Sequence, residues 1–501
     1  MKSNHKKTTE HHHTIPFFWT LVFLTLGLAS CKKFLDIPPP NSLPVTTSVF
    51  NNNGAATSAE LAIYVQMFQN SESYNMADDM GIYADELQNF DNAYQSQVQL
   101  YRNSLLAKQN PNWGTYGNGG FYNYIYEANA VISGLQTTAG ASAAVKQQLT
   151  GEAYFMRAFW HFYLTNIYGD VPLVLTINYT TNKSLARTPR VQVLQQVVND
   201  LNTAEGLLNV NYVDATDTST TANRVRPNKA VAEALLARAE LYLADYDKKN
   251  MADYKAAETA ATTVITNSAY SLSPLSGVFL ANSSEAIWQL QTISNVNYDT
   301  PEGYGFILLA APNTGGNYNC TTISTQLMNA FEPNDQRKSS WIGSITEGTT
   351  TFYFPYKYKN YTLLNTEYDM VLRLGEQYLI RAEARAEQNN IAGALQDLNI
   401  IRSRAGLPDY SGTQDQVSVL TAILHERQVE LFTEWGARWF DLERAVQNDP
   451  TGVNANTVLG SPGNVCAAKG GTWNADGYQL LLPVPQSERT VDFNLTQNPG
   501  Y

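Results

Sequence analysis

The sequence predicts a mainly α-helical protein in which helical hairpins alternate with long irregular loops and a few short strands. The first observation is that most long segments place apolar residues three and four positions apart, which is the spacing of one helix face. The second is that several of these segments end in Gly or Pro, which terminate helices. The third is that the connections are long, polar and rich in Asn, Gly and Tyr. Long loops on a rigid scaffold often carry binding residues.

The helical pattern is clear in seven segments. Residues 151–172 combine the apolar spacing with a closing Gly and Pro. Residues 187–208 begin with a helix-start signal, in which Thr188 is expected as N-cap and Pro189 as the first helical residue. We expect the last segment in the chain to be one long helix. The other five segments are 229–247, 254–270, 373–390, 391–408 and 416–445.

Two pairs of predicted helices resemble each other. Residues 229–270 and 373–408 each contain a helix, a turn and a second helix, and the dipeptide Ala-Glu recurs at Ala239 and Ala382. Small residues recur where the two helices must approach closely, which is typical of tetratricopeptide-type hairpins. Two unrelated Ala-rich hairpins would give a similar pattern. Because the copies lie far apart in the sequence, we do not expect one continuous row.

The first fifty residues predict an export signal and a tether. A charged leader precedes the apolar run "TIPFFWTLVFLTLGLAS", which has the plan of a secretory signal. The run ends in Leu-Ala-Ser-Cys, which is similar to a bacterial lipobox, where the cysteine is lipidated after cleavage. An ordinary signal with an incidental cysteine is the alternative. We expect a signal peptide over 1–30, a lipidated Cys31 with a proline-rich tether over 31–50, and one domain over 51–501.

The charge balance excludes several kinds of partner. The chain has 45 Asp and Glu residues against 33 Lys and Arg residues, a net charge of −12. Phosphate contacts need clustered basic residues, so no nucleic acid is expected. Attraction to anionic lipid headgroups is disfavoured for the same reason, so membrane attachment would come through the lipid on Cys31.

The two other cysteines leave two alternatives open. Cys320 and Cys466 would meet oxidising conditions in an exported protein and could form a disulfide, but two free thiols are equally compatible with the sequence. Neither has a His or a second Cys nearby, so no zinc site is expected.

The residues offer no convincing catalytic motif. "HERQVE" begins like a zinc-protease helix, but the second histidine of H-E-x-x-H would fall at Val429. His161 lies in an aromatic helix and is expected to be a packed core residue. Acidic pairs at 78–79 and 85–86 are the kind a glycosidase uses, but so acidic a chain offers many such pairs. The charged residues of "EWGARWFDLER" are expected to brace a helix end. We therefore expect a protein that is not an enzyme and that needs no metal and no cofactor.

An ordered set of segments resembles the SusD/RagB family, the outer-membrane lipoproteins of nutrient-uptake systems in Bacteroidetes. The resemblance spans nearly the full predicted mature length. It implies a SusD-like fold, whose tetratricopeptide-like hairpins contact a SusC-like TonB-dependent transporter and whose other half presents a ligand site. The segments include "SCKKFLD", "ADEL", "WGTYGNGGFYNYIYEANAVI", "GEAYFMRAFWHFYLTNIYGDVPL", "SEAIWQLQ", "FEPNDQRKSSW", "HERQVELFTEWGARWFDLER", "LLPVPQSE" and "LTQNPGY".

The resemblance also implies a function without catalysis. A lipoprotein of this kind sits on the extracellular side of the outer membrane and delivers an oligosaccharide or polysaccharide to its transporter. Three alternatives remain open. One is a peptide-binding lid of a RagAB-like transporter, another is a glycan hydrolase anchored beside such a system, and the third is a structural lid with no ligand of its own.

The ligand site is expected in two loops. Sugars present apolar C–H faces and a rim of hydroxyl groups, so a complementary site needs flat aromatic rings beside Asn, Asp and backbone groups. Residues 88–95 follow "ADEL" and residues 296–318 follow the strand-like "IWQLQ", and in similar proteins both regions face the ligand. Each aromatic residue could instead anchor its own loop, and Trp113 is expected in the core. The candidate ligand contacts are Asn89, Phe90, Asp91, Tyr94, Tyr298, Asp299, Tyr304, Asn317 and Tyr318.

Overall fold

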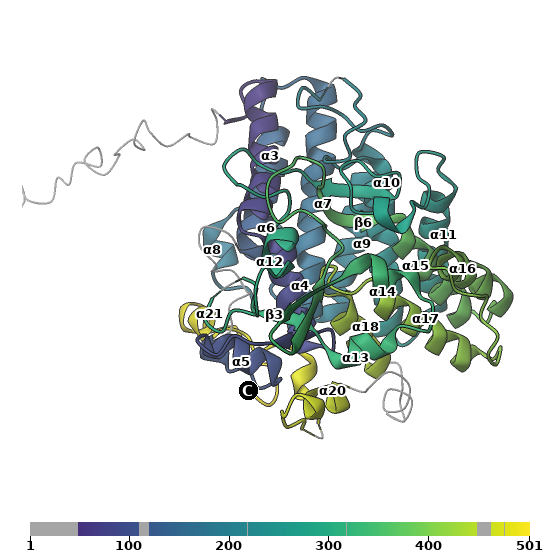
Figure 1. Cartoon of the computed structure of the whole chain (residues 1–501). Helices are drawn as coiled ribbons and strands as arrows, with labels where there is room; N and C mark the ends of the chain where they lie inside the picture. Colours follow the sequence, from purple (N-terminus) through teal and green to yellow (C-terminus); the bar gives the residue numbers. More distant parts are fainter. Residues whose placement is uncertain (1–48, 110–119, 218, 317, 448–461, 475) are drawn as a thin grey trace, which may run out of the picture. The chain divides into compact units, whose positions relative to one another are not determined.

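The computed structural model describes residues 49–501 except for 110–119, 218, 317, 448–461 and 475 (Figure 1). The predicted signal peptide, Cys31, most of the predicted tether, Trp113 and Asn317 therefore lie outside the described residues. Residues Val49–Tyr501 form one compact unit. In the part of the chain that the structure describes, no helix has both the length and the apolar character needed to cross a membrane.

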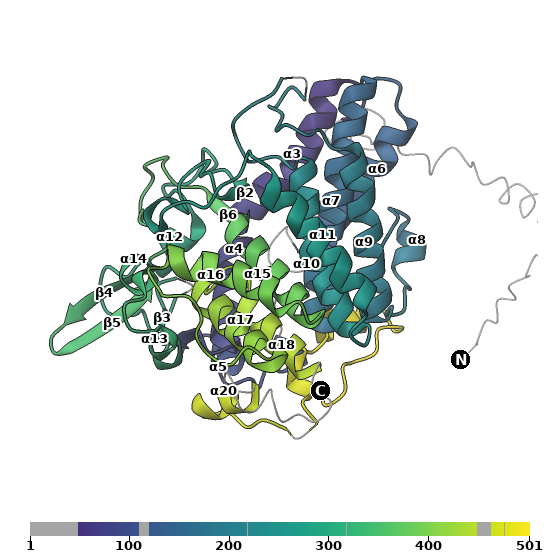
Figure 2. The same ribbon diagram turned by 90° about the vertical axis from the view of Figure 1, so that its right-hand side faces the viewer.

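A row of helices, each packed against the next, dominates the architecture (Figures 1 and 2). Both predicted hairpins are confirmed, as α10–α11 and α15–α16. The expectation that they would not form a continuous row is wrong, because α11 packs directly on α15 while residues 267–373 form other parts of the fold. The row comprises α6 (Phe121–Thr137), α7 (Ala143–Tyr168), α9 (Arg190–Leu207), α10 (Lys229–Tyr246), α11 (Met251–Thr266), α15 (Leu374–Glu387), α16 (Ile391–Arg404) and α17 (Gln416–Glu430).

Side-chain caps mark where several of these helices begin, and a glycine marks where one of them ends. Ser142, Asn228 and Asn390 each accept a hydrogen bond from a backbone N–H in the first turn of the following helix. Helix α7 ends at Gly169, whose φ of +72° is a conformation that favours glycine. Helix α9 begins at Arg190 with a proline in the cap position, one residue later than predicted.

The predicted single helix over 416–445 is wrong, because the chain breaks between α17 and α18 (Ala437–Gln447). Thr433, Trp435 and Gly436 all have positive φ values, of 52°, 50° and 75°. Distant parts of the chain hold this turn, since the Thr433 N–H donates to Glu86 Oε2 and the Trp435 indole N–H donates to the Met370 carbonyl. Tertiary contacts therefore override a continuous helical pattern.

The strands form three two-stranded antiparallel sheets among the described residues. Strand β1 (Leu87–Asn89) pairs with β3 (Thr321–Ile323), so that Leu87 lies opposite Ile323. Strand β2 (Ala286–Leu290) pairs with β6 (Asp369–Arg373), and β2 confirms the predicted strand-like segment. Strands β4 (Ile342–Glu347) and β5 (Thr350–Pro355) form the hairpin that projects in Figure 2.

Further helices and turns complete the fold, and among them α3 packs against α6 and α7 of the row. The other described elements are α3 (Asn53–Gln69), α4 (Glu72–Tyr83), α5 (Gln95–Tyr101), α8 (Tyr179–Asn182), α12 (Pro301–Phe306), α13 (Thr325–Ala330), α14 (Gln336–Trp341), α20 (Pro462–Ala468) and α21 (Gln486–Val491), with the 3-10 turns η2 (Ala107–Gln109), η3 (Leu275–Gly277) and η4 (Tyr478–Leu480).

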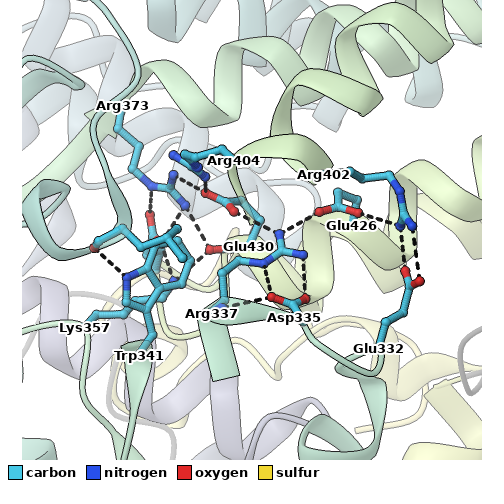
Figure 3. Close-up of polar contacts among 12 residues, drawn as sticks. Glu332, Asp335, Arg337, Trp341, Lys357, Arg373, Arg402, Arg404, Glu426 and Glu430 are labelled. Carbon is cyan, nitrogen blue, oxygen red and sulfur yellow. Dashed lines mark hydrogen bonds and ion pairs between the residues drawn. The ribbon is translucent and has the colours of Figure 1, made fainter. Parts of the chain in front are cut away.

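A buried network of ion pairs ties α14, β6, α16 and α17 together (Figure 3). Glu430, at the end of α17, is its centre. One carboxylate oxygen accepts from Arg373 at 2.6 Å and from Arg404, and the other accepts from Arg337 at 3.0 Å. Burial opposes ionisation, but the three guanidinium groups outweigh it and hold the pKa of Glu430 well below its ordinary value. The motif "HERQVE" is therefore part of a structural network.

The predicted bracing role of "EWGARWFDLER" is confirmed. Arg444 pairs with Asp441 at 2.8 Å and with Glu383 of α15 at 2.7 Å. Arg438 reaches back to Asp85 at 2.7 Å. His161 is also buried as predicted, where its Nε2 accepts from the Val174 N–H and burial lowers its pKa to about 3.

Candidate ligand-binding site

The two loops in which the site was predicted lie side by side. Pairing of β1 with β3 brings residues 88–95 against the end of residues 296–318. Beyond the strands the contact continues, because the Phe90 N–H donates to the Cys320 carbonyl at 2.8 Å and the Asn92 N–H donates to the Thr314 carbonyl at 3.1 Å. Segments more than two hundred positions apart in the chain thus form one surface region.

Four partly exposed tyrosines form a contiguous group of rings at this region, here called the tyrosine cluster: Tyr298, Tyr304, Tyr318 and Tyr361. Tyr304 is its centre. Its ring stacks on Tyr298 at 5.0 Å between centroids with an interplanar angle of 22°, and lies 5.2 Å from each of Tyr318 and Tyr361. Rings held in this way offer flat apolar faces beside hydroxyl groups, which is what a sugar ring requires.

Buried aromatic residues of α3 and α4 support the tyrosine cluster from below. Phe68 of α3 stacks on Tyr298 at 6.1 Å, and Tyr74 of α4 lies 5.1 Å from Tyr318. Ser71, between the two helices, adopts a left-handed conformation with φ of 54° and places its hydroxyl 3.4 Å from that of Tyr318. The orientation of the rings is therefore fixed by packing.

Asp299 supports the cluster indirectly. It is fully buried, and its carboxylate accepts N–H bonds from Leu364 at 2.7 Å, Asn365 at 2.6 Å and Thr366 at 2.9 Å. Burial opposes its ionisation, but these donors and Asn360 outweigh it and hold the pKa of Asp299 below its ordinary value. Its oxygens are thus engaged in holding the loop that carries Tyr361.

The other predicted residues form the turn after β1. Asn89 exchanges two hydrogen bonds with the backbone of Asp91, and the buried Asp91 carboxylate accepts from the Ala93 and Tyr94 N–H groups. Phe90 packs edge-on against Phe352 of β5 at 5.9 Å. The ring of Tyr94 is 49% exposed. The structure places these residues beside the tyrosine cluster without ring contacts to it.

The region presents no uncommitted positive charge among the described residues of its loops. Residues 88–95 and 296–318 hold no Lys or Arg, and the segment that leads to Tyr361 holds Lys357 and Lys359. The Lys357 ammonium lies among the rings of Phe279, Trp341 and Phe432 and pairs with Glu434. The Lys359 ammonium donates to the carbonyls of residues 340 and 356. Neutral rings, hydroxyls and amides therefore dominate the surface.

Three residues of this candidate site were not among the predicted ligand contacts. Tyr361 lies in the cluster, while Phe68 and Tyr74 lie beneath it. A signal for Tyr361 was present, since residues 353–361 hold four tyrosines. No local signal marks Phe68 or Tyr74, because both read as ordinary core positions of helices.

A close approach between α12 and the loop of Tyr361 leads to a first prediction. A Cβ added at Gly303 would lie 2.5 Å from the backbone oxygen of Asn360. We expect Gly303→Ala to displace this loop and lower the free energy of unfolding by about 1–3 kcal/mol. Denaturant unfolding measures the loss. Gly206→Ala is the control, since nothing lies within 4 Å of that added Cβ and the change suits the exposed helix. Equal stability of both variants would contradict the close approach.

Helix α4 carries buried acids beneath the same loops. Asp78 is buried and accepts a hydrogen bond from the Thr321 hydroxyl at 3.0 Å. Burial, followed by the neighbouring Asp79, raises the pKa of Asp78 to about 8. Burial likewise raises the pKa of Glu72 to about 7. Asp78 is therefore protonated in the folded protein at neutral pH and adds no charge under the site.

This shift predicts a pH-dependent stability. The unfolded chain loses the Asp78 proton near pH ~4, whereas the folded chain keeps it to about pH 8. The contribution of Asp78 to stability is therefore complete below about pH 4 and is lost as the pH rises toward 8. Because Asn cannot ionise, Asp78→Asn should gain stability over wild type between pH 5 and pH 8, on the order of a few kcal/mol.

Denaturant unfolding at both pH values measures this gain. Asp415→Asn is the control, because the exposed Asp415 caps α17 and hydrogen bonds from Ser418 hold its pKa below the ordinary value. It stays ionised throughout this range in both states, so its effect should be the same at pH 5 and pH 8. A pH-independent effect of Asp78→Asn would contradict the prediction.

The two cysteines are free thiols rather than a disulfide. Cys320 lies against the carbonyl of Tyr318 at 3.2 Å, and Cys466 lies against that of Arg102 at 3.6 Å. Among the described residues, no three or more His, Cys, Asp or Glu side chains are placed to hold a metal ion.

Comparisons with known proteins agree on one family. The family model described as "SusD family" matches residues 336–501, and the one described as "Starch-binding associating with outer membrane" matches residues 33–243. A curated relative, the SusD-like protein P2 of Formosa agariphila, is 25% identical over 70% of this chain and 74% of its own length.

Solved structures resemble the whole fold. A SusD superfamily protein from Bacteroides vulgatus gives a TM-score of 0.72 at 20% identity, covering 90% of this chain and 99% of its own. The surface glycan-binding protein A from Bacteroides uniformis gives 0.70 at 18% identity, covering 88% and 98%. These structural matches confirm the predicted fold class.

Proposed function

This chain belongs to the SusD/RagB family, and from that premise we propose that it binds an uncharged glycan at the tyrosine cluster. The observation that carries the proposal is the group of four partly exposed, mutually packed tyrosine rings. Amide and hydroxyl groups of the neighbouring loops supply hydrogen bonds around such rings. The lack of an uncommitted cation on the described loops favours a neutral sugar chain over an anionic one.

The proposal includes a membrane anchor and a transporter partner. Lipidation of Cys31 would hold the protein at the extracellular side of the outer membrane, and the family description "associating with outer membrane" supports this location. The helix row α6 to α16 would contact a SusC-like TonB-dependent transporter, to which the glycan is delivered. Copurification of such a transporter with the anchored protein tests this part.

Binding without catalysis is the expected mode of action. The acidic pairs considered for glycosidase chemistry have structural roles, since Asp85 pairs with Arg438 and Glu86 accepts from the Thr433 N–H. Asp78 is engaged with Thr321. The described residues therefore offer no exposed carboxylate pair at the tyrosine cluster.

Native affinity electrophoresis tests the ligand class. Residues 32–501, the predicted mature chain without its lipidated cysteine, contain the whole compact unit and would be run through gels cast with neutral and anionic polysaccharides. We expect retardation by a neutral polysaccharide. Free migration in every gel would contradict the proposal and favour a peptide ligand or a structural lid, and retardation only by anionic chains would contradict the neutral class.

A further inference from the structure

A cavity of about 420 Å³ opens along the same helix, α3, that supports the tyrosine cluster. It lies between α3, residues 213–226 and residues 290–293, and its volume is within the range of small-molecule sites. Nothing in the proposed function uses it. Its aliphatic walls are Leu61, Val65, Val213, Val225, Leu290 and Ile293.

Two segments of the chain connect the cavity to the tyrosine cluster. Helix α3 places Leu61, Val65 and Phe68 at spacings of four and three, so they share one helix face. The first two line the cavity, and Phe68 stacks under Tyr298. The second segment is residues 290–298, whose first four residues line the cavity and whose last residue is Tyr298 of the cluster. The two sites are therefore neighbouring parts of one surface.

The polar groups at the floor of the cavity are already paired. Arg226 donates to Glu152 at 2.6 Å, to Asp217 and to the Asp214 carbonyl, and the Tyr64 hydroxyl donates to Glu152 at 2.8 Å. Among the described residues that line it, the cavity therefore offers no free cation, and these carboxylates would repel an anionic group. Exposed amides of its lining can make neutral hydrogen bonds, those of Gln291 and of Asn223, whose Oδ1 accepts from Asn282 at 3.1 Å and whose NH₂ group can donate.

We propose that this cavity is a second subsite, which takes an uncharged apolar group, an acyl or alkyl substituent, carried by the glycan on the tyrosine cluster. The inference rests on the proposed function and extends it to the ligand's chemistry. The aliphatic walls provide burial for the substituent, and the shared α3 face places it next to the sugar chain. A glycan that carries such substituents is then preferred over its unsubstituted form.

Two glucosides that differ only in the alkyl group test the subsite. Hexyl β-D-glucoside and methyl β-D-glucoside would be titrated against residues 32–501, and saturation-transfer NMR would report which ligand protons contact the protein. We expect the hexyl compound to bind about tenfold more tightly, with saturation concentrated on its chain. Equal affinity of the two compounds would overturn the proposal.

A matched pair of variants locates the binding. Val65 is 40% exposed in α3 and Val417 is 52% exposed in α17, so Val→Lys at either position adds one charge to an exposed helix face. Val65→Lys should abolish the preference for the hexyl compound, and Val417→Lys should retain it. Ala215→Trp, at an exposed wall residue, should also abolish it. A preference that survives both cavity variants would overturn the proposal.

The experiments distinguish failure of the proposed function from failure of the second subsite alone. If the proposed function is wrong, the chain migrates freely through every polysaccharide gel. If only the second subsite is wrong, a neutral polysaccharide still retards the chain, while wild type and the cavity variants bind the hexyl compound equally well.

Discussion

Replacing Tyr304 with alanine is expected to weaken glycan binding by about thirtyfold, or about 2 kcal/mol. Its ring contacts those of Tyr298, Tyr318 and Tyr361, so its removal takes away one flat face and the lateral support of three others. Affinity electrophoresis in the gel that retards wild type, followed by calorimetry with an oligosaccharide from it, measures the loss.

Tyr353→Ala is the matched control for this prediction. Tyr353 lies on the projecting hairpin, is 41% exposed and is outside the tyrosine cluster, so its removal should leave the affinity unchanged. Circular dichroism and melting of both variants establish that each is folded. A folded Tyr304→Ala variant with wild-type affinity would contradict the assignment of the cluster as the binding surface.

Replacing Glu430 with alanine is expected to produce the largest loss of stability, about 3–5 kcal/mol. The carboxylate is fully buried and is shared by Arg373, Arg404 and Arg337, which would then be left in the interior without their common partner. The measurement is the free energy of unfolding in denaturant at neutral pH.

The partly exposed pair between Glu205 and Lys229 provides the comparison. Their charged groups lie 3.2 Å apart at the surface, where water screens the attraction. Glu205→Ala should therefore change the free energy of unfolding by less than about 1 kcal/mol. Similar losses for Glu205→Ala and Glu430→Ala would show that the buried network does not hold α14, β6, α16 and α17 together.

The sequence predicted local elements well where helix-period spacing and caps coincide. The hairpins α10–α11 and α15–α16 follow directly from such patterns. The packing of one hairpin on the other could not be predicted in this way. No local pattern shows that the chain forms other parts of the fold over residues 267–373 before α15 packs on α11. The break after Glu430 could not be predicted from the sequence either. The left-handed backbone conformations of Thr433 and Trp435 depend on hydrogen bonds to the distant residues Glu86 and Met370.

For the candidate site, composition pointed to two loops that the structure brings side by side, but it did not predict their geometry. Tyr298, Tyr304 and Tyr318 were named from residue type, and the structure brings them into one cluster. Tyr361 stands in a tyrosine-rich segment, but nothing local shows that Asp299 holds its loop against residues 296–318 through backbone hydrogen bonds. Long-range hydrogen bonding of this kind leaves no periodic signal in the sequence.

A crystal structure of the chain with an oligosaccharide from the retarding polysaccharide is the most direct test of the binding surface. Our account predicts sugar rings in van der Waals contact with Tyr304 and at least one neighbouring ring of the cluster, with hydroxyl groups directed to the loops around it. An ordered oligosaccharide elsewhere on the protein, with the tyrosine cluster bare, would contradict it.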